Sequence, residues 1–327
     1  MTAVLVASDK FKGTLTSEEV GHAVSEGLRQ VGVSCDVLVV ADGGEGTADA
    51  LRRVRGGRML TATVSDALGR PIDATFVLVD DERLAFVDAA QAAGLWRLRD
   101  DERDPRRATS AGVGELIAAA AEAGADDVLL APGGTATVDG GAGAIAVLRG
   151  ASRVPRLRIA CDVQTAWESA AEIFGPQKGA DSATVETLAR RLDELARTLQ
   201  RDPRGVPMTG CGGALSGGLW ACFEAELVPG AELVLDAIGF DELLADASLV
   251  ITGEGRIDEQ TKEGKLVAAV ARRSAVARIP CVAVVGRNDL SADRQRSLGL
   301  ACVVEAGTID ALREAGRMLA ATRGPAV

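Results

Sequence analysis

The chain has 327 residues, of which 47% are hydrophobic and 25% are charged, and its formal net charge at pH 7 is −11. This length suits two domains of ~100–200 residues each. Because nucleic acids and anionic membranes also carry negative charge, the acidic balance disfavours both as partners, although a few lysines in one cleft could still bind an anionic substrate. No apolar stretch reaches the ~18–20 residues of a membrane helix, and the first apolar run, Ala3–Ala7, is too short for a secretion signal. We therefore expect a cytoplasmic protein that does not enter a membrane.

Cysteine, histidine and tyrosine usage narrows the kinds of site that the chain can build. The six cysteines form no C-x-x-C pair, which favours reduced thiols in the core. There is no tyrosine, and the one histidine, His22, lies off the apolar stripe of a predicted helix, where we expect it to be solvated. A Ser-His-Asp triad and a histidine-rich zinc site are therefore disfavoured. Proton transfer would fall to carboxylates or lysines.

Short apolar runs recur along the chain, with helical segments between many of them. The runs are apolar throughout and rich in β-forming residues, which is typical of strands buried on both faces of a parallel sheet. In chain order, the predicted strands are Val4–Ala7, Val37–Ala41, Val128–Ala131, Leu157–Ala160, Leu249–Ile251, Cys281–Val285 and Cys302–Val304. The predicted helices are Ser17–Arg29, Gly114–Ala123, Thr184–Leu199, Gly264–Ala275 and Ile309–Ala321. This alternation predicts a Rossmann-like, doubly wound α/β fold.

One stretch alternates in polarity instead. The stretch Ile72–Val79 has a period of two, and Asp80–Glu82 then turns the chain into Leu84–Val87. This pattern predicts an antiparallel hairpin with one covered face. We therefore predict a smaller α/β domain, residues 59–114 and 201–245, inserted into a discontinuous Rossmann-like domain of residues 1–58, 115–200 and 246–327.

Acidic or glycine-rich segments follow most of the predicted strands. They are Ser8–Thr14, Asp42–Thr47, Pro132–Gly141, Cys161–Asp162, Thr252–Asp258 and Gly286–Arg287. Because parallel strands end at one edge of a sheet, we expect these segments to converge where open α/β folds bind ligands. Glycine lets backbone N–H groups approach phosphate oxygens, and carboxylates suit the Mg²⁺ that accompanies phosphate. The pattern predicts a phosphate or nucleotide site, although any single segment could serve packing or cap a helix.

Two common nucleotide motifs are absent from the sequence. Gly264-Lys265 is followed by Leu266 rather than by Ser or Thr, so there is no Walker A motif. No G-x-G-x-x-G follows the first strand, which disfavours a dinucleotide site of the usual type.

Four strings, in the right order along the chain, resemble the bacterial glycerate kinase family. They are Ser8–Thr16, Ala41–Thr47, Phe174–Ala180 and Ile251–Thr261. The resemblance implies transfer of phosphate from ATP to D-glycerate, usually giving 2-phosphoglycerate and less often 3-phosphoglycerate. It also implies a Rossmann-like domain and a smaller α/β domain with the active cleft between them. Independently of the resemblance, we expect Mg²⁺ as a cofactor and consider a homo-oligomer as a possible state.

The resemblance and the charges of the residues assign roles at the site. Substrate or phosphate binding falls to Asp9, Lys10, Asp42, Gly43, Gly44, Glu45, Gly133, Gly134, Thr135, Lys178, Gly253, Glu254 and Arg256. The catalytic candidates are Asp162, Asp258 and Lys12, with Asp162 favoured as the base, and the Mg²⁺ candidates are Asp42, Asp162 and Asp258. Structural alternatives remain: Lys10 or Lys178 as a surface lysine, Glu254 as a helix cap, and Arg256 paired with Glu254 or Asp258.

The chain also departs from the family pattern. Thr135 and Val138 stand where the family usually has Ser and Asn, and Gln164–Trp167 replaces an Asn-Pro-Leu segment. The stretch between Leu148 and Leu157 is shorter than usual. Two alternatives therefore stay open, namely a kinase for a related small hydroxy acid and a catalytically weakened ligand-binding homologue.

Overall fold

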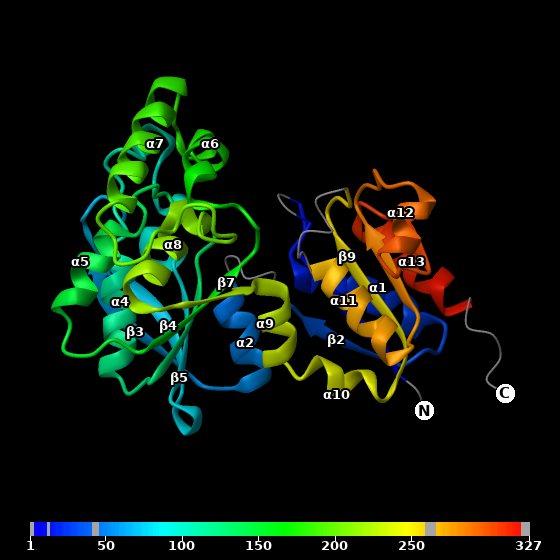
Figure 1. Cartoon of the computed structure of the whole chain (residues 1–327). Helices are drawn as coiled ribbons and strands as arrows, with labels where there is room; N and C mark the ends of the chain where they lie inside the picture. The colour runs from blue at the N-terminus through cyan, green and yellow to red at the C-terminus, as the bar shows by residue number, and fades with distance from the viewer. Residues whose placement is uncertain (1–2, 12–13, 41–45, 259–265, 322–327) are drawn as a thin grey trace. The chain divides into compact units, whose positions relative to one another are not determined.

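The computed structural model describes residues 3–11, 14–40, 46–258 and 266–321 (Figure 1). The chain divides into two compact units. The first unit comprises residues 1–42 and 234–327, and the second unit is the continuous stretch 43–233.

The first unit contains a five-stranded sheet in which every neighbouring pair of strands is parallel. Its strand order is β11-β10-β9-β1-β2. The strands are β1 (Ala3–Ser8), β2 (Cys35–Val39), β9 (Ala247–Glu254), β10 (Cys281–Val285) and β11 (Cys302–Glu305). The central strands β1, β9 and β10 are buried almost throughout, as their unbroken apolar runs predict.

Helices cover the first sheet on both faces. They are α1 (Ser17–Gln30), α10 (Phe240–Leu244), α11 (Leu266–Ala277), α12 (Ala292–Ser297) and α13 (Ile309–Ala321). A capping box of Thr16 and Glu19 starts α1, which packs closely along α13 (Figure 1). The close approach needs glycine, since a Cβ on Gly27 would lie 2.0 Å from the Arg313 carbonyl oxygen. His22, the one histidine, is exposed on α1, which confirms its predicted position.

The second unit contains a mixed six-stranded sheet in the order β3-β4-β5-β6-β7-β8. The strands are β3 (Arg58–Ser65), β4 (Pro71–Val79), β5 (Leu84–Asp88), β6 (Asp127–Ala131), β7 (Arg156–Cys161) and β8 (Glu226–Pro229). The strands β3, β4 and β5 pair antiparallel, which confirms the predicted hairpin, whereas β5 to β8 are parallel. The carboxyl ends of β5, β6 and β7 therefore lie along one edge.

The helices of the second unit connect and cover these strands. They are α2 (Thr47–Arg55), α3 (Ala90–Ala93), α4 (Ala111–Glu122), α5 (Ala142–Gly150), α6 (Ala170–Phe174), α7 (Ser182–Ala196) and α8 (Cys211–Phe223). α9 (Gly230–Ala237) then carries the chain back to the first unit. A separate small core surrounds the fully buried indole of Trp167, whose Nε1 donates a hydrogen bond to the Leu192 carbonyl at 3.0 Å.

The division into units differs from the one predicted from the sequence. Residues 115–200, expected in the Rossmann-like domain, belong to the second unit. The cause is strand pairing: β6 joins the sheet of the hairpin by pairing with β5, whereas β1 pairs with β2 and β9. The acidic and glycine-rich segments therefore do not share one sheet edge. Ser8–Thr14, Thr252–Asp258 and Gly286–Arg287 follow strands of the first sheet, while Pro132–Gly141 and Cys161–Asp162 follow strands of the second.

Two further predictions concern the thiols and the membrane. All six cysteines are free, and five are buried, but Cys302 is exposed rather than in the core. Within the described ranges, no helix combines the length and the apolar character needed to cross a bilayer.

Candidate functional site

The loop after β6 is the first candidate site in the second unit. We call residues 132–141 the β6 loop. Backbone hydrogen bonds fasten it to the segment after β5: the Leu95 N–H donates to the Gly134 carbonyl at 2.9 Å, and the Ala136 N–H donates to the Ala93 carbonyl at 2.8 Å. These bonds fix the loop at the carboxyl edge of β5 and β6.

Two successive backbone N–H groups in the β6 loop are available to a ligand. Gly134 is exposed, with φ at +72°, and Gly133 is half-buried. In the part of the chain that the structure describes, neither N–H has a hydrogen-bond acceptor. Successive N–H groups at a left-handed glycine form a concave site for an anion. The geometry therefore suits the phosphate-binding role predicted for these two glycines.

Lys178 lies beneath the β6 loop rather than on the surface. Its side chain is 4% exposed, and its Nζ lies 2.7 Å from the Thr137 carbonyl oxygen and 3.4 Å from the Thr135 Oγ1. Burial lowers its pKa from 10.5 to about 7, and the negative charges of Asp139 and Asp162 oppose that shift. The surface-lysine alternative is therefore wrong, and the amine holds the loop through its backbone.

Asp162 follows β7 directly and is half-buried. Its charge acts on Lys178, so the two predicted residues are brought into one electrostatic neighbourhood. The preceding thiol, Cys161, has its pKa raised by a hydrogen bond with Cys211 and by burial, so it stays neutral. Asp162 is therefore an ionisable acid at this edge, and it stays the candidate base.

Residues outside the predicted set, namely Ser110, Gly212 and Gly213, help to shape the β6 loop from below. The Thr135 hydroxyl donates to the Gly212 carbonyl at 3.3 Å, and a Cβ on Gly213 would lie 1.9 Å from the Thr137 carbonyl oxygen. Asp139 accepts hydrogen bonds from the N–H and hydroxyl of Ser110 and from the N–H groups of Gly141 and Gly143. The glycine cluster at the start of α8 was the sequence signal that could have revealed this support.

Asp88, at the end of β5, also has a role that was not predicted. Its carboxylate accepts hydrogen bonds from the Gly46 and Ala48 N–H groups at 3.0 Å each, at the start of α2. Asp88 thereby ties the end of the Asp42–Thr47 segment to the sheet of the second unit.

The edge of the first sheet carries another predicted set. The Asp9 N–H donates to the Gly253 carbonyl at 2.8 Å, and the Lys10 N–H donates to the Asp9 Oδ1 at 2.7 Å. Gly253 is required by close packing, because a Cβ there would lie 2.2 Å from the Val284 carbonyl oxygen. Glu254 ends β9 and is buried. The structure thus brings Asp9, Lys10 and Gly253 together.

Arg256 is engaged by neighbouring carboxylates. Its Nε lies 2.6 Å from an Asp289 oxygen and 3.8 Å from an Asp258 oxygen, and its side chain is 59% exposed. Hydrogen bonds from Arg287 and Arg256 lower the pKa of Asp289. The predicted structural pairing of Arg256 with Asp258 is the weaker of these contacts, and its main partner, Asp289, was not predicted.

Five predicted residues lie outside the described residues: Lys12, Asp42, Gly43, Gly44 and Glu45. Of the two remaining carboxylates proposed for Mg²⁺, Asp258 belongs to the first unit and Asp162 to the second. Among the residues that are described, no three His, Cys, Asp or Glu side chains form a metal-binding group.

Free N–H groups in a glycine-rich loop, a lysine and a carboxylate at the ends of parallel strands are typical of α/β enzymes that bind phosphorylated ligands. The sequence pattern of the glycerate kinase family matches residues 4–153 and 148–322. A glycerate kinase from Halalkalibacterium halodurans is 34% identical in a comparison that covers 88% of this chain and 86% of that protein. A glycerate 2-kinase from Escherichia coli is 34% identical, with 86% and 84% covered.

The fold comparison agrees with the sequence comparison. A crystal structure assigned to glycerate kinase 2 from Salmonella typhimurium LT2 matches with a TM-score of 0.81 and 33% identity, covering 98% of both chains. The chain belongs to the glycerate kinase family. It is therefore a kinase, a phosphotransferase with an alcohol group as acceptor, and such enzymes use ATP.

Proposed function

We propose that this kinase phosphorylates D-glycerate with ATP and gives 2-phosphoglycerate. The observation that carries the proposal is the second unit's sheet edge, where the free N–H groups of Gly133 and Gly134 share one edge with Lys178 and Asp162. Membership of the glycerate kinase family supplies the acceptor class.

Phosphoryl transfer depends on positioning and on neutralising charge more than on covalent help from the protein. In the proposed mechanism, the N–H groups of Gly133 and Gly134 bind an anionic oxygen of a substrate. Lys178 holds the β6 loop through the Thr137 carbonyl and, when it is protonated, contributes positive charge beneath it. Asp162 accepts the proton of the glycerate hydroxyl as that oxygen attacks the terminal phosphorus of ATP, and ADP leaves with the electron pair of the broken P–O bond.

The first unit has proposed roles that follow from the family strings. Lys10 and Lys12 offset negative charge on the glycerate carboxylate or on the transferring phosphoryl group, with Asp9 next to Lys10. The remaining phosphate-binding candidates are Asp42, Gly253, Glu254 and Arg256 in the first unit, and Gly43, Gly44, Glu45 and Thr135 in the second unit. Asp258 is the second choice as the base, because Arg256 lies 3.8 Å from its carboxylate.

Mg²⁺ is part of the proposal, since it usually binds one or two carboxylates together with substrate phosphates. Asp162 fits this demand best, because it is a hard oxygen donor that directly follows a strand of the second sheet. When bound, the ion would neutralise charge on the phosphates. Asp258 fits less well beside Arg256, and Asp42 lies outside the described residues.

The test is an assay of the purified protein with Mg-ATP and D-glycerate. We expect ADP release that depends on D-glycerate, and a phosphorus NMR spectrum of 2-phosphoglycerate. Release of ADP without any acceptor preference among glycerate, hydroxypyruvate, tartronate and small sugars would contradict the substrate assignment. ATP binding without turnover on any of them would instead favour the catalytically weakened homologue.

A kinase for a related hydroxy acid is the second candidate, and one observation favours it. The segment Gln164–Trp167, which departs from the family pattern, contacts the chain that precedes α8. The Met208 N–H donates to the Gln164 carbonyl at 3.3 Å, and the Gly210 N–H donates to the Thr165 carbonyl at 2.9 Å. Because this segment begins two residues after Asp162, its changed sequence could alter the acceptor that the site prefers.

We also place the protein in the cytoplasm, because its cysteines are free and five of them are packed in the cores as thiols. A homo-oligomer stays a prediction.

A further inference from the structure

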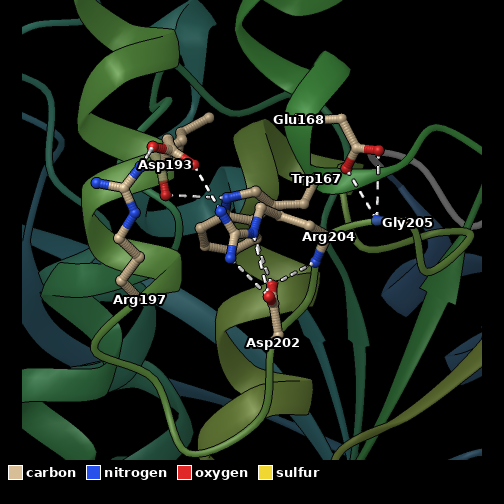
Figure 2. Close-up of polar contacts among 8 residues, drawn as sticks. Trp167, Glu168, Asp193, Arg197, Asp202, Arg204 and Gly205 are labelled. Carbon is tan, nitrogen blue, oxygen red and sulfur yellow. Dashed lines mark hydrogen bonds and ion pairs between the residues drawn. The ribbon is translucent and has the colours of Figure 1, made fainter.

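Trp96 carries the one exposed aromatic ring of the chain. The sequence has six phenylalanines, three tryptophans and no tyrosine, and each of these aromatic residues lies in the described ranges. Trp96 is 53% exposed, whereas the others are buried or half-buried. Trp167, for example, is fully buried, and its Nε1 donates to the Leu192 carbonyl (Figure 2). A single exposed apolar side chain is ordinary, so the position of the Trp96 ring decides whether it has a function.

Trp96 borders the β6 loop through the backbone of the two residues before it. Leu95 donates its N–H to the Gly134 carbonyl at 2.9 Å, and Gly94 forms an antiparallel bridge with Thr135. A Cβ on Gly94 would lie 2.7 Å from the Trp96 Nε1, so the indole lies against the backbone of that bridge. The exposed ring is therefore placed beside the glycines of the β6 loop whose N–H groups have no acceptor.

The indole of Trp96 is also held in place. The guanidinium of Arg97 lies over one face of the ring, 4.4 Å from its centroid, and the Arg97 Nη2 donates to the Asp73 carbonyl at 3.2 Å. Because Asp73 belongs to β4, the arginine connects the ring to the sheet. Since Arg97 covers one face, the opposite face of the ring is the one left to a ligand. A ring that is already held loses little conformational freedom when a ligand stacks on it.

A comparison with Trp220 shows which of these features is specific to Trp96. Arg201 lies over the Trp220 ring, 3.6 Å from its centroid, so an arginine on an indole occurs twice in the second unit. Trp220 is half-buried on α8, however, and lies outside the segment that is bonded to Gly134. Exposure and the place beside the β6 loop therefore distinguish Trp96, whereas the stacked arginine does not.

We propose that Trp96 stacks on the adenine ring of ATP while phosphates of the same ATP bind the N–H groups of Gly133 and Gly134. The inference rests on the proposed function, because it assigns the anion bound by these N–H groups to the nucleotide. ATP is the aromatic substrate of the proposed reaction, since D-glycerate has no ring. The N–H groups suit the phosphate end of a nucleotide. An indole suits the other end, because every base has a face that can stack on it.

The stack is tested by isothermal titration calorimetry of the full chain without glycerate. The ligands are ADP and pyrophosphate, which carries the two phosphates without the base. Trp96→Leu keeps an apolar side chain but removes the ring, so we expect about tenfold weaker binding of ADP and unchanged binding of pyrophosphate. Trp96→Phe keeps a ring and should recover most of the affinity for ADP. Trp220→Phe is the matched control and should bind ADP as the wild type does.

Tryptophan fluorescence gives a second measurement of the same contact. Stacking of the base on the exposed indole should quench its emission, so ADP should quench the emission of Trp220→Phe but not that of Trp96→Phe. Quenching of equal size in both variants would contradict the stack.

Three calorimetric results would overturn the inference. They are equal affinity of the wild type and Trp96→Leu for ADP, an equal loss of affinity for ADP and pyrophosphate in Trp96→Leu, and no binding of ADP to the wild type. The proposed function can fail separately. If Trp96→Leu weakens the binding of ADP alone but D-glycerate elicits no release of ADP from ATP, the stack stands and the assigned acceptor is wrong. If D-glycerate is phosphorylated and Trp96→Leu binds ADP as the wild type does, the stack is wrong and the acceptor stands.

Discussion

The two sheet edges carry the same kinds of residue but are built in different ways. At the edge of the second unit, a buried lysine and a half-buried aspartate hold the β6 loop: the Lys178 amine binds the Thr137 carbonyl, and Asp139 accepts several hydrogen bonds. At the edge of the first unit, Arg256 and Arg287 meet Asp289 in ion pairs that are largely exposed. Buried contacts resist solvent and salt, whereas exposed ion pairs contribute ~0–1 kcal/mol and are screened.

This difference indicates where the geometry of each edge comes from. The β6 loop takes its shape from the folded second unit and needs no ligand to form. The Arg256 side chain, by contrast, can leave Asp289 for a phosphate at little cost. The unfolding of the two units can be followed separately, because Trp96, Trp167 and Trp220 all lie in the second unit. Tryptophan fluorescence therefore reports on that unit alone.

The largest expected effect is on catalysis at the second edge. Asp162→Asn should lower kcat by about 10²–10⁴-fold, because the proposed base can no longer accept a proton. Steady-state kinetics measure the change, and an unaltered thermal transition shows that the fold is intact. The matched variant in the first unit, Asp258→Asn, should lose much less. A larger loss of kcat in Asp258→Asn than in Asp162→Asn would indicate that the catalytic base lies in the first unit.

The next effect concerns the support of the β6 loop by a glycine. Gly213→Ala should lower the free energy of unfolding of the second unit by about 3 kcal/mol or more, since it combines positive φ with a clash. Its Cβ would lie 1.9 Å from the Thr137 carbonyl oxygen. Gly205→Ala is the control, because Gly205 also has positive φ but a Cβ there meets no atom within 4 Å, and it should cost about 1–2 kcal/mol. Urea titration followed by tryptophan fluorescence measures the loss of unfolding free energy in both variants. Equal losses in Gly213→Ala and Gly205→Ala would show that the β6 loop shifts to accommodate the added Cβ.

The third effect is a pH dependence. Lys178 stays charged in the unfolded chain up to its ordinary pKa of 10.5 but loses its proton near pH 7 when folded. The unfolded chain therefore binds more protons between these values, and the free energy of unfolding should rise with pH across that range by up to about 1.4 kcal/mol per pH unit. Lys178→Met should remove this contribution, as judged from urea titrations at pH 7.5, 8.5 and 9.5. The same slope in both proteins would mean that Lys178 keeps its proton in the fold.

The smallest effect is expected at the exposed pair of the first unit. Arg256→Gln should change the free energy of unfolding by less than about 1 kcal/mol, because the ion pair with Asp289 is largely solvated. Far-UV circular dichroism during urea unfolding reports on both units and measures this change. The transition followed by tryptophan fluorescence reports on the second unit, and it should be the same as in the wild type. A loss as large as that of Gly213→Ala would show that the first edge is also held by a buried contact.

The elements of the fold were predictable because they depend on local patterns. The apolar runs located the strands, and α13 begins and ends where its periodicity predicts. The division into units was not predictable in the same way, because it depends on whether β6 pairs with β5 or with β1, and both choices bury the same apolar residues. Likewise, no local signal connects Arg256 with Asp289 or tells which carbonyl receives the Lys178 amine, since these partners are distant in sequence.

The first unit is built from two stretches of chain that the second unit separates in sequence, and this affects the order in which the units fold during synthesis. β1 is held between β2 and β9, and β9 emerges from the ribosome only after the whole second unit has been translated. The second unit is continuous and can fold as soon as it is complete, whereas the nascent β1 and β2 must wait for their missing neighbour. Since domains usually fold in the order in which they are made, this protein should reverse that order, with its amino-terminal strands among the last to become stable.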